Sequence, residues 1–338
     1  MAVLGSAGDA RRALRRYRAA GAVVEHWALP GPGLIESLRG ASLVVRATRD
    51  PVWDDVIAAC RAIPVITHAP AGSTGRITLV GGGPGAPDLM TVAARAALGD
   101  ADVVFCDRLG PRSAAREMAL GAELVDVGKR PGHHAVPQEQ IESLMVERAL
   151  RGEHVVRLKG GDPFVLGRGR EEVEAALAEG IHVSVIPGVT SAIAAPGAAG
   201  IPVTYRGVSQ LFTVLSGHTA PTEEQCRQLT ALGGTVVILM GVGTVHHTAA
   251  SMVAAGMAAT TPAGIIERAH TPEQRTTVCT LADLSANVAR VVCASPAVIV
   301  IGDVVRLAHC WPPEFATSAT TFAPDTATFA TDTAERRS

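Results

Sequence analysis

The sequence has few aromatic residues, almost no net charge and no long hydrophobic run. Aromatic residues make up only 3% of its 338 residues, which disfavours a base-stacking surface for nucleic acid. The 30 basic and 32 acidic residues nearly cancel, which excludes a globally basic nucleic-acid-binding protein. Apolar runs such as Thr235–Met240 and Pro296–Ile301 are as long as strands and far short of the ~20 residues that span a bilayer. We therefore expect no nucleic-acid partner and no membrane partner.

The sequence also lacks an export signal and the cysteine spacing that is typical of disulfide or metal sites. Met1–Ala10 lacks a basic segment followed by an apolar stretch and a cleavage site. The cysteines are scattered and form no C-x-x-C pair: Cys60, Cys106, Cys226, Cys279, Cys293 and Cys310. Such spacing is typical of reduced thiols in a cytoplasmic protein and disfavours a zinc or iron–sulfur site, so we expect no metal.

The length of 338 residues suggests about two domains, and a hydrophobic fraction of 47% is ample for one or two buried cores and excludes a mainly disordered protein. Apolar strands that alternate with helices indicate an α/β protein. Residues 1–75 predict a short parallel βα unit, about half of a dinucleotide-binding domain. Helices are expected at Asp9–Ala20 and Trp53–Arg61. The expected strands are Ala2–Leu4, Val23–Trp27, Ser42–Arg46 and Pro64–Thr67. A linker is expected at Ala69–Gly75, which is rich in Pro, Gly and Ser.

Residues 76–309 predict a second and larger α/β region. It is expected to form two lobes that meet near residues 190–215. Its apolar, Val/Ile-rich segments are expected to be strands: Ile77–Val80, Val103–Cys106, Val155–Leu158, Val183–Ile186, Leu211–Ser216, Thr235–Met240, Ala263–Ile266 and Ala297–Ile301. Residues 310–338 are rich in Ala and Thr and are expected to be a disordered tail.

A glycine-rich loop follows the first of these strands. Val80–Asp88 reads VGGGPGAPD and precedes a helix expected to begin near Leu89. Glycines allow a backbone to approach a ligand closely, and a helix N-terminus offers free N–H groups. A plain glycine-rich turn is the alternative. Because the spacing is not G-x-G-x-x-G, a pyrophosphate site is less favoured than a neutral or zwitterionic ligand.

Charged residues follow several other predicted strands. Phe105–Leu109 reads FCDRL, and Val127–Arg130 reads VGKR with His133 and His134 close behind. Ligands of open α/β sheets bind at the carboxyl ends of strands, but a surface ion pair explains the Asp-Arg pair of FCDRL equally well. For the charges of VGKR, a solvated loop is the favoured explanation. The pair His133–His134 is too little for a metal site.

Two further segments combine glycine, proline and polar residues. Arg157–Glu172 reads RLKGGDPFVLGRGREE, which is dense in arginines able to bind carboxylates. A long ordered loop is the alternative. Ile186–Arg206 reads IPGVTSAIAAPGAAGIPVTYR, in which Thr190 and Ser191 are either helix caps or hydroxyls that line a pocket.

Taken in order, these segments resemble one family, the S-adenosylmethionine-dependent tetrapyrrole methylases of the uroporphyrinogen-III C-methyltransferase type. The resemblance spans about residues 76–309, and RLKGGDPF followed by GRG is its most specific element. It implies a two-lobed fold with S-adenosylmethionine in the cleft and a homodimer. It also implies methylation of uroporphyrinogen III at C2 and C7, which gives precorrin-2 for sirohaem and cobalamin synthesis.

The resemblance also assigns roles to individual residues. Asp107 matches the proton acceptor and Lys129 the proton donor. The positions that match substrate-binding residues are Arg108, Arg130, Arg168, Glu171 and Arg206. The positions that match cofactor-binding residues are Pro84, Gly160, Gly161, Asp162, Val165, Thr190, Ser191, Met240 and Ala269. Arg168 is also a candidate base, but the very high ordinary pKa of arginine favours a carboxylate clamp.

The chain departs from the family pattern at a few places that carry no catalytic charge. These are Ala86–Asp88 after the Gly-Pro-Gly, Arg170 in place of glycine, and Leu239 in place of an aromatic residue. A non-catalytic tetrapyrrole carrier and a methylase of a later corrinoid precursor are alternatives. The retained Asp107 and Lys129 argue against the carrier, and RLKGGDPF with GRG argues against the later precursor.

The N-terminal piece resembles a shortened precorrin-2 dehydrogenase domain of sirohaem synthase. Gly5–Gly8 stands where the nucleotide loop would be, and Ala47–Asp50 reads ATRD in place of Ala-Thr-Asp-Asp. An arginine beside Asp50 would weaken that carboxylate as a base. We expect this piece to be vestigial for catalysis. The alternative is a bifunctional sirohaem synthase with NAD-dependent dehydrogenase activity in residues 1–75.

Overall fold

The computed structural model describes residues 1–67, 75–107, 110–128 and 136–308. The chain divides into two compact units. The first consists of Met1–Gly83 and Pro87–Gly188, and the second of Pro84–Ala86 and the chain from Val189 onward. Within the described residues there are three sheets, two in the first unit and one in the second. The predicted linker at 69–75 and the predicted tail at 310–338 lie almost wholly outside the described residues.

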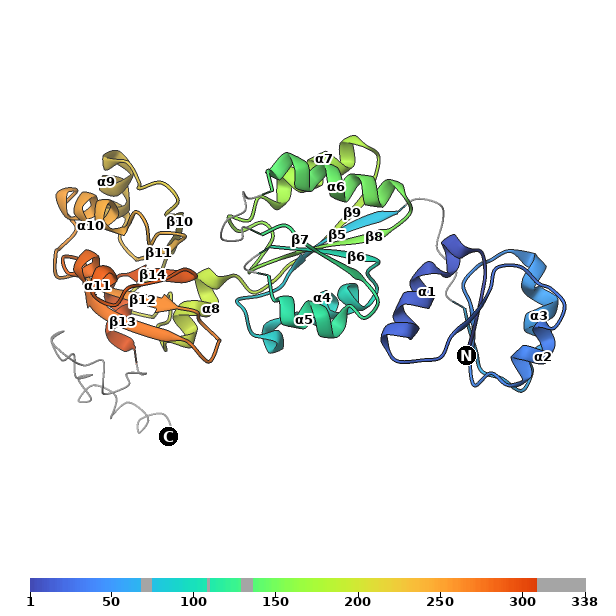
Figure 1. The fold of residues 1–338 in the computed structure, drawn as a ribbon. Coiled ribbons are helices and arrows are strands. Elements are labelled where there is room, and N and C mark those ends of the chain that lie inside the picture. The colour runs from blue at the N-terminus through green and yellow to red at the C-terminus, as the bar shows by residue number, and fades with distance from the viewer. Residues whose placement is uncertain (68–74, 108–109, 129–135, 309–338) are drawn as a thin grey trace, which may run out of the picture. The chain divides into compact units, whose positions relative to one another are not determined.

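The N-terminal sheet is parallel, with strand order β2-β1-β3-β4. Its strands are β1 (Ala2–Leu4), β2 (Glu25–Trp27), β3 (Val44–Arg46) and β4 (Val65–Thr67). Helix α1 (Ala7–Ala19) packs on one face, and α2 (Leu34–Arg39) and α3 (Asp54–Ala59), with the 3-10 turn η1 (Pro51–Trp53), pack on the other (Figure 1). All four predicted strands are confirmed, and their observed bounds lie within two residues of the predicted ones. Helix α2 was missed because the Pro and Gly residues before it predict a loop.

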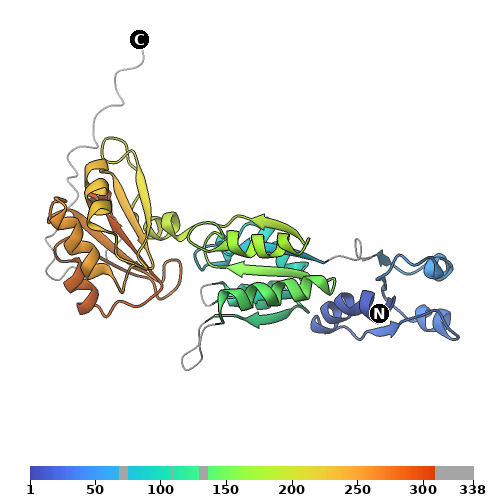
Figure 2. The ribbon, with the colours of Figure 1, turned by 90° about the horizontal axis from the view of Figure 1, so that it is seen from above.

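The second sheet of the first unit is also parallel, with strand order β7-β6-β8-β5-β9. Its strands are β5 (Arg76–Gly81), β6 (Val103–Cys106), β7 (Glu123–Asp126), β8 (His154–Lys159) and β9 (His182–Ile186). Helices α4 (Val92–Gly99) and α5 (Arg112–Met118) cover one face, and α6 (Gln138–Leu150) and α7 (Gly169–Ala178) cover the other, so both faces are buried (Figures 1 and 2).

This parallel arrangement gathers the loops that carry the predicted motifs. The register pairs Gly81 with Lys159, Val80 with Ile186, and Cys106 with Leu158. The segments that follow β5, β6, β8 and β9 therefore leave the sheet at one edge. The expected helix after the glycine-rich loop starts later than predicted, at Val92, because the Thr91 hydroxyl accepts the Ala94 N–H and caps it there. The 3-10 turn η2 (Pro87–Leu89) precedes it.

The sheet of the second unit is mixed, with strand order β10-β11-β14-β12-β13. Its strands are β10 (Phe212–Ser216), β11 (Thr235–Leu239), β12 (Pro262–Glu267), β13 (Arg275–Thr280) and β14 (Ala297–Ile301). Helices α9 (Glu223–Leu232), α10 (Val245–Ala254) and α11 (Leu284–Arg290) pack on one face. Helix α8 (Ser191–Ala198) and the 3-10 turn η3 (Asp303–Leu307) pack on the other (Figure 1). None of the helices in the described ranges is long and apolar enough to cross a membrane.

Candidate functional site

Four glycines bring the loops of the first unit into backbone contact. A Cβ added to Gly188 would stand 2.2 Å from the Gly161 carbonyl oxygen and 2.7 Å from Gly81. Gly161 also donates its N–H to the Gly83 oxygen at 2.7 Å and accepts the Gly83 N–H at 3.2 Å. The ends of β5, β8 and β9 can approach this closely only because no side chain intervenes. The predicted cofactor segment Gly160–Asp162 is therefore held at this edge by backbone contacts.

Asp162 fixes the loop that follows β8. Its Oδ1 accepts the Phe164 N–H at 2.8 Å and its Oδ2 accepts the Gly188 N–H at 3.0 Å. Val165 is half-buried in the same loop and donates its N–H to the Asp162 carbonyl oxygen at 3.3 Å. Asp162 thus joins the β8 and β9 loops. Asp162 therefore stabilises the loop structure, in addition to the ligand contact that the resemblance implies.

Asp107 stands directly after β6 and is half-buried. Its Oδ1 accepts the Gly110 N–H at 2.7 Å, and its Oδ2 lies 3.5 Å from Nη2 of Arg157. Arg157 belongs to β8, the strand beside β6. Both carboxylate oxygens are therefore held from two directions, and the carboxylate remains partly exposed at the edge where the loops meet.

Three charged side chains lie buried behind Asp107. Arg157 and Lys159 alternate on β8 with Leu158, and both contact Glu172 of α7. Arg157 Nε lies 2.9 Å from Glu172 Oε1, and Lys159 Nζ lies 2.9 Å from Glu172 Oε2. We call Arg157, Lys159 and Glu172 the buried triad. Burial, together with the charge of Arg157, lowers the pKa of Lys159. Burial acts to raise the pKa of Glu172, but the two cations outweigh it and the pKa is lowered.

Arg168 and Glu171 form an exposed pair where α7 begins. Arg168 has a positive φ of 57° and stands at the N-cap of the helix, and its Nε donates to Glu171 Oε1 at 2.9 Å. The hydrogen bond that Arg168 donates to Glu171 raises the pKa of Arg168, so this guanidinium is harder to deprotonate than a free one. The hydrogen bond from Arg168 lowers the pKa of Glu171. The geometry suits a cation presented to solvent and does not suit a base.

In the second unit, the register places Met240 and the turn at Ala269 at one sheet edge. Leu239, the last residue of β11, and Ile266 of β12 both pair with Val298 of β14. Met240 follows β11 with a positive φ of 58° and is exposed, and Ala269 follows β12 and is buried. A Cβ on Gly85 would stand 3.7 Å from the Ala269 carbonyl oxygen, which brings the Pro84–Ala86 segment to the same turn.

Helix α8 supports this edge of the second unit. The Thr190 hydroxyl accepts the Ala192 N–H at 3.3 Å and caps the helix, and Ser191 is its first residue. His270 Nε2 lies 2.9 Å from the Ala194 oxygen and ties the helix to the turn at Ala269. The cap interpretation of Thr190 is therefore confirmed, and it leaves the hydroxyl's own proton available. Arg206 lies in an exposed turn between Tyr205 and Ser209.

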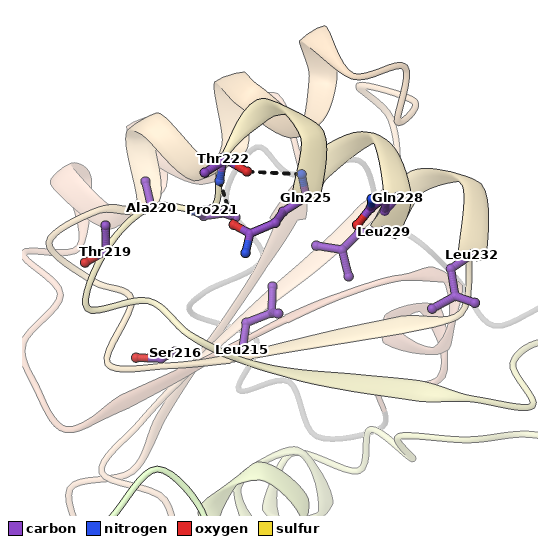
Figure 3. A pocket seen from close by; sticks show the side chains of 10 residues that line it. All are labelled: Leu215, Ser216, Thr219, Ala220, Pro221, Thr222, Gln225, Gln228, Leu229 and Leu232. Atoms are coloured by element: carbon purple, nitrogen blue, oxygen red, sulfur yellow. Dashed lines mark hydrogen bonds between the residues drawn. The ribbon is translucent and has the colours of Figure 1, made fainter.

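A cavity of about 600 Å³ in the second unit does not coincide with any of the predicted site residues. It lies between β10 and α9, where Leu215 and Leu229 face each other and the capping box of Thr222 and Gln225 closes one end (Figure 3). Its lining is mainly apolar and belongs to one stretch of chain. We therefore place the candidate site at the sheet edges described above and not in this cavity.

The candidate residues divide between the two units. The first unit holds Asp107, Gly160, Gly161, Asp162, Val165, Arg168 and Glu171, and the second holds Pro84, Thr190, Ser191, Arg206, Met240 and Ala269. Arg108, Lys129 and Arg130 lie outside the described residues, as do His133 and His134. Across the described part of the chain, His, Cys, Asp and Glu side chains form no group that could hold a metal ion.

Sequence reasoning missed Glu172 and Gly188 as site residues. A signal for Glu172 was present, because Arg157 and Lys159 are charged residues at alternate positions of an otherwise apolar strand and require a buried partner. The signal for Gly188 was weaker. A glycine after Pro187 predicts a turn, and only the fold shows that Gly161 and Gly81 lie against it.

In the N-terminal piece, the side chains near the predicted nucleotide loop contact each other. The Ser6 hydroxyl accepts the Asp9 N–H at 3.2 Å at the start of α1 and donates to the Asp9 carboxylate at 3.0 Å. Asp50 accepts the Val52 N–H at 3.0 Å and caps η1. The first turn of α1 therefore already carries a carboxylate, which repels a phosphate group.

Comparison with known proteins points to one family. A family model described as tetrapyrrole (corrin/porphyrin) methylases matches residues 76–285. An S-adenosyl-L-methionine-dependent uroporphyrinogen III methyltransferase of Methanosarcina barkeri is 43% identical over 241 residues, which are 70% of this chain and 94% of the relative. Siroheme synthase 2 of Aeromonas hydrophila is 45% identical over 235 residues, but the chain spans only 50% of that protein.

A solved structure agrees with these relatives. It is a uroporphyrin-III C-methyl transferase of Thermus thermophilus complexed with S-adenyl homocysteine. The match has 38% identity and a TM-score of 0.59, and it covers 69% of this chain and 100% of that one. The likeness therefore extends over that whole chain and over about two thirds of this one.

Proposed function

The chain belongs to the tetrapyrrole (corrin/porphyrin) methylases, and on that premise we propose that it transfers methyl groups from S-adenosylmethionine to C2 and C7 of uroporphyrinogen III, giving precorrin-2. The observation that carries the proposal is the relative from Methanosarcina barkeri, because 94% of its length aligns with this chain at 43% identity. The product would serve sirohaem or cobalamin synthesis. This proposal places the protein in the cytoplasm as a homodimer with a small-molecule tetrapyrrole substrate.

The residues present fit S-adenosylmethionine. Gly160 and Gly161 carry no side chain, which allows a ligand to approach their backbone closely. Within the second unit, the exposed Met240 and the Pro84–Ala86 segment beside Ala269 present apolar surface to a ligand. When bound, this group supplies an electrophilic methyl on its sulfonium. The protein's own task is then to orient the reacting carbon and to handle a proton.

Asp107 is suited to accept that proton. A pyrrole carbon attacks a methyl group more readily when a proton leaves the ring, so a carboxylate at the reacting edge is needed. Gly110 and Arg157 hold the two oxygens of Asp107, and part of the side chain stays exposed to a ligand. Lys129, outside the described residues, is proposed as the proton donor on the resemblance alone.

Arg168 and Arg206 are suited to bind the carboxylates of the substrate. Uroporphyrinogen III is a polycarboxylate, and arginine binds carboxylates through paired N–H donors. Arg168 already binds Glu171 in this way, so a substrate carboxylate would take over the place of Glu171. Arg108 and Arg130 are proposed for the same task from the sequence.

We propose a structural role for the N-terminal sheet and no dehydrogenase activity. The Asp9 carboxylate at the first turn of α1 and the capping task of Asp50 support this proposal. The alternative, a bifunctional sirohaem synthase, draws on relatives such as siroheme synthase 2, of which this chain spans half. An intact nucleotide site would be expected to leave the helix N-terminus free for phosphate.

One anaerobic assay tests these proposals together. The purified chain is mixed with uroporphyrinogen III and S-adenosylmethionine, with and without NAD, and absorbance spectra are recorded. The expected result is a precorrin-2 spectrum that does not depend on NAD. A further NAD-dependent change to sirohydrochlorin would establish the bifunctional alternative. If no methylated product forms although the tetrapyrrole binds, the protein is a carrier or acts on a later precursor.

A further inference from the structure

The buried triad behind Asp107 has more charge than the stability of the fold requires. Glu172 has no exposed surface, and Arg157 and Lys159 are 3% and 4% exposed. Burying ions is costly, and well-packed apolar residues of similar volume often serve stability as well or better. Three buried charges between α7 and β8 therefore call for a reason beyond packing.

Contacts of Arg157 indicate that reason. Its Nη1 donates to the carbonyl oxygens of Phe105 at 3.3 Å and Leu158 at 3.2 Å, and its Nε donates to Glu172 at 2.9 Å. The planar guanidinium is thereby fixed on three sides. Its remaining Nη2 faces Asp107 Oδ2 at 3.5 Å. Arg157 is thus the part of the buried triad that reaches the partly exposed Asp107.

Glu172 holds this arrangement in place. One carboxylate binds both cations, and Lys159 Nζ lies 3.0 and 2.9 Å from its two oxygens. Gln138 Nε2 adds a donor to Oε1 at 3.3 Å. With Asp107 included, two carboxylates balance two cations. Removing the charge of Glu172 would leave Arg157 free to pair with Asp107 alone and to move toward it.

We propose that Glu172 is a positioning residue for methyl transfer: it anchors Arg157 so that Asp107 is held in the orientation in which it accepts the proton. The inference rests on the proposed function of Asp107. Glu172 itself does not touch the substrate, since its side chain is wholly buried. Its neighbour Glu171, which is exposed, has no part in this role.

The first test is the isosteric variant Glu172→Gln in the full chain. We expect kcat for methylation to fall about tenfold, part of the 10²–10⁴-fold that a positioned acid or base contributes. The KM for uroporphyrinogen III and the affinity for S-adenosylhomocysteine should stay within about twofold, because these measure binding and not proton transfer. The matched control is Glu174→Gln, which removes an exposed charge paired with Arg170 on the same helix and should leave kcat unchanged.

The decisive test is a cycle with Asp107→Asn, measured by single-turnover transfer of a labelled methyl group. If Glu172 acts through Asp107, adding Glu172→Gln to Asp107→Asn should cause no further loss. A loss of equal factor in both backgrounds would overturn the proposal and make Glu172 structural. An unchanged kcat in Glu172→Gln would overturn it as well.

Two further comparisons distinguish a failure of this proposal from misfolding of the variant and from a failure of the proposed function. If Glu172→Gln does not fold, Arg157→Lys is used in the same cycle, because it keeps the charge and loses the fixed fork of donors. Glu172→Asp should restore part of kcat, since it keeps the charge with a shorter reach. If the unaltered chain gives no methylated product, the proposed function fails and the inference with it. If the unaltered chain is active and the cycle is additive, only the inference fails.

Discussion

The close backbone contacts of Gly188 predict that adding one methyl group there strongly affects both stability and ligand affinity. In Gly188→Ala, the new Cβ would lie 2.2 Å from the Gly161 oxygen and 2.7 Å from two Gly81 backbone atoms. Atoms in ordinary contact are ~3.5 Å apart, so backbone must move by about 1 Å. No flexible side chain can absorb this movement, because all of the atoms approached belong to backbone.

The expected cost has two parts. Overpacking of this kind lowers the free energy of unfolding by about 1–3 kcal/mol. The same displacement moves the Gly160–Asp162 segment, since Asp162 also binds the Gly188 N–H. We therefore expect S-adenosylhomocysteine to bind at least about tenfold more weakly, which corresponds to ~1.4 kcal/mol.

Urea denaturation and titration calorimetry with S-adenosylhomocysteine measure the two parts separately. Gly197→Ala is the matched control, because nothing lies within 4 Å of its added Cβ and it belongs to helix α8. It should raise the free energy of unfolding by about 0.5–1 kcal/mol and leave affinity unchanged. If Gly188→Ala matched the unaltered chain in stability and affinity, the claim that backbone packing shapes the cofactor loop would be refuted.

Three other predictions follow from side chains of the first unit. Asp107→Asn should reduce turnover by about 10²-fold or more while S-adenosylhomocysteine binding persists, and an equal loss of binding would show that Asp107 is structural. Arg168→Ala should raise the KM for uroporphyrinogen III about tenfold with kcat retained, and an unchanged KM would contradict its role as a carboxylate clamp. Burial, followed by the charge of Arg76, lowers the pKa of His154 to about 3 from 6.5, so the unfolded chain takes up a proton that the folded chain does not. Its contribution to stability therefore falls as the pH drops below 6.5, by about 2 kcal/mol between pH 7.5 and 5. Urea denaturation of His154→Gln should show a flatter pH dependence, and the exposed His182→Gln should not.

Most of the strands could be predicted from the sequence because burial on both faces leaves apolar runs. Val155–Leu158 and Ala297–Ile301 are of this kind, and both lie in the interior of their sheets. The edge strand β13 was missed, since Arg275–Thr280 is rich in threonine and its pairing with β12 is a long-range choice. This segment is a strand because it pairs with β12, and its local sequence pattern does not predict a strand.

The candidate site divides in the same way. Motifs located the loops, because Gly-Gly-Asp and Pro-Gly are local signals that the chain must turn. What the sequence could not supply is the set of contacts between loops. Asp162 binds the Gly188 N–H, and Arg157 reaches Asp107 of the neighbouring strand, only because β5, β6, β8 and β9 end at one edge.

The two adjacent glutamates of α7 show how far local reasoning can go. Resemblance selects Glu171, and the structure leaves it exposed beside Arg168. Glu172 follows Glu171 by one residue, which rotates its side chain by about 100° around the helix axis. It therefore lies on the buried face together with Val173 and Ala176. A carboxylate on that apolar stripe must meet buried cations, and β8 supplies them at Arg157 and Lys159. The helix period therefore predicts that Glu172 is buried, and the strand alternation predicts that Arg157 and Lys159 lie on one face of β8. Only the packing of α7 on β8 shows that these three side chains contact each other.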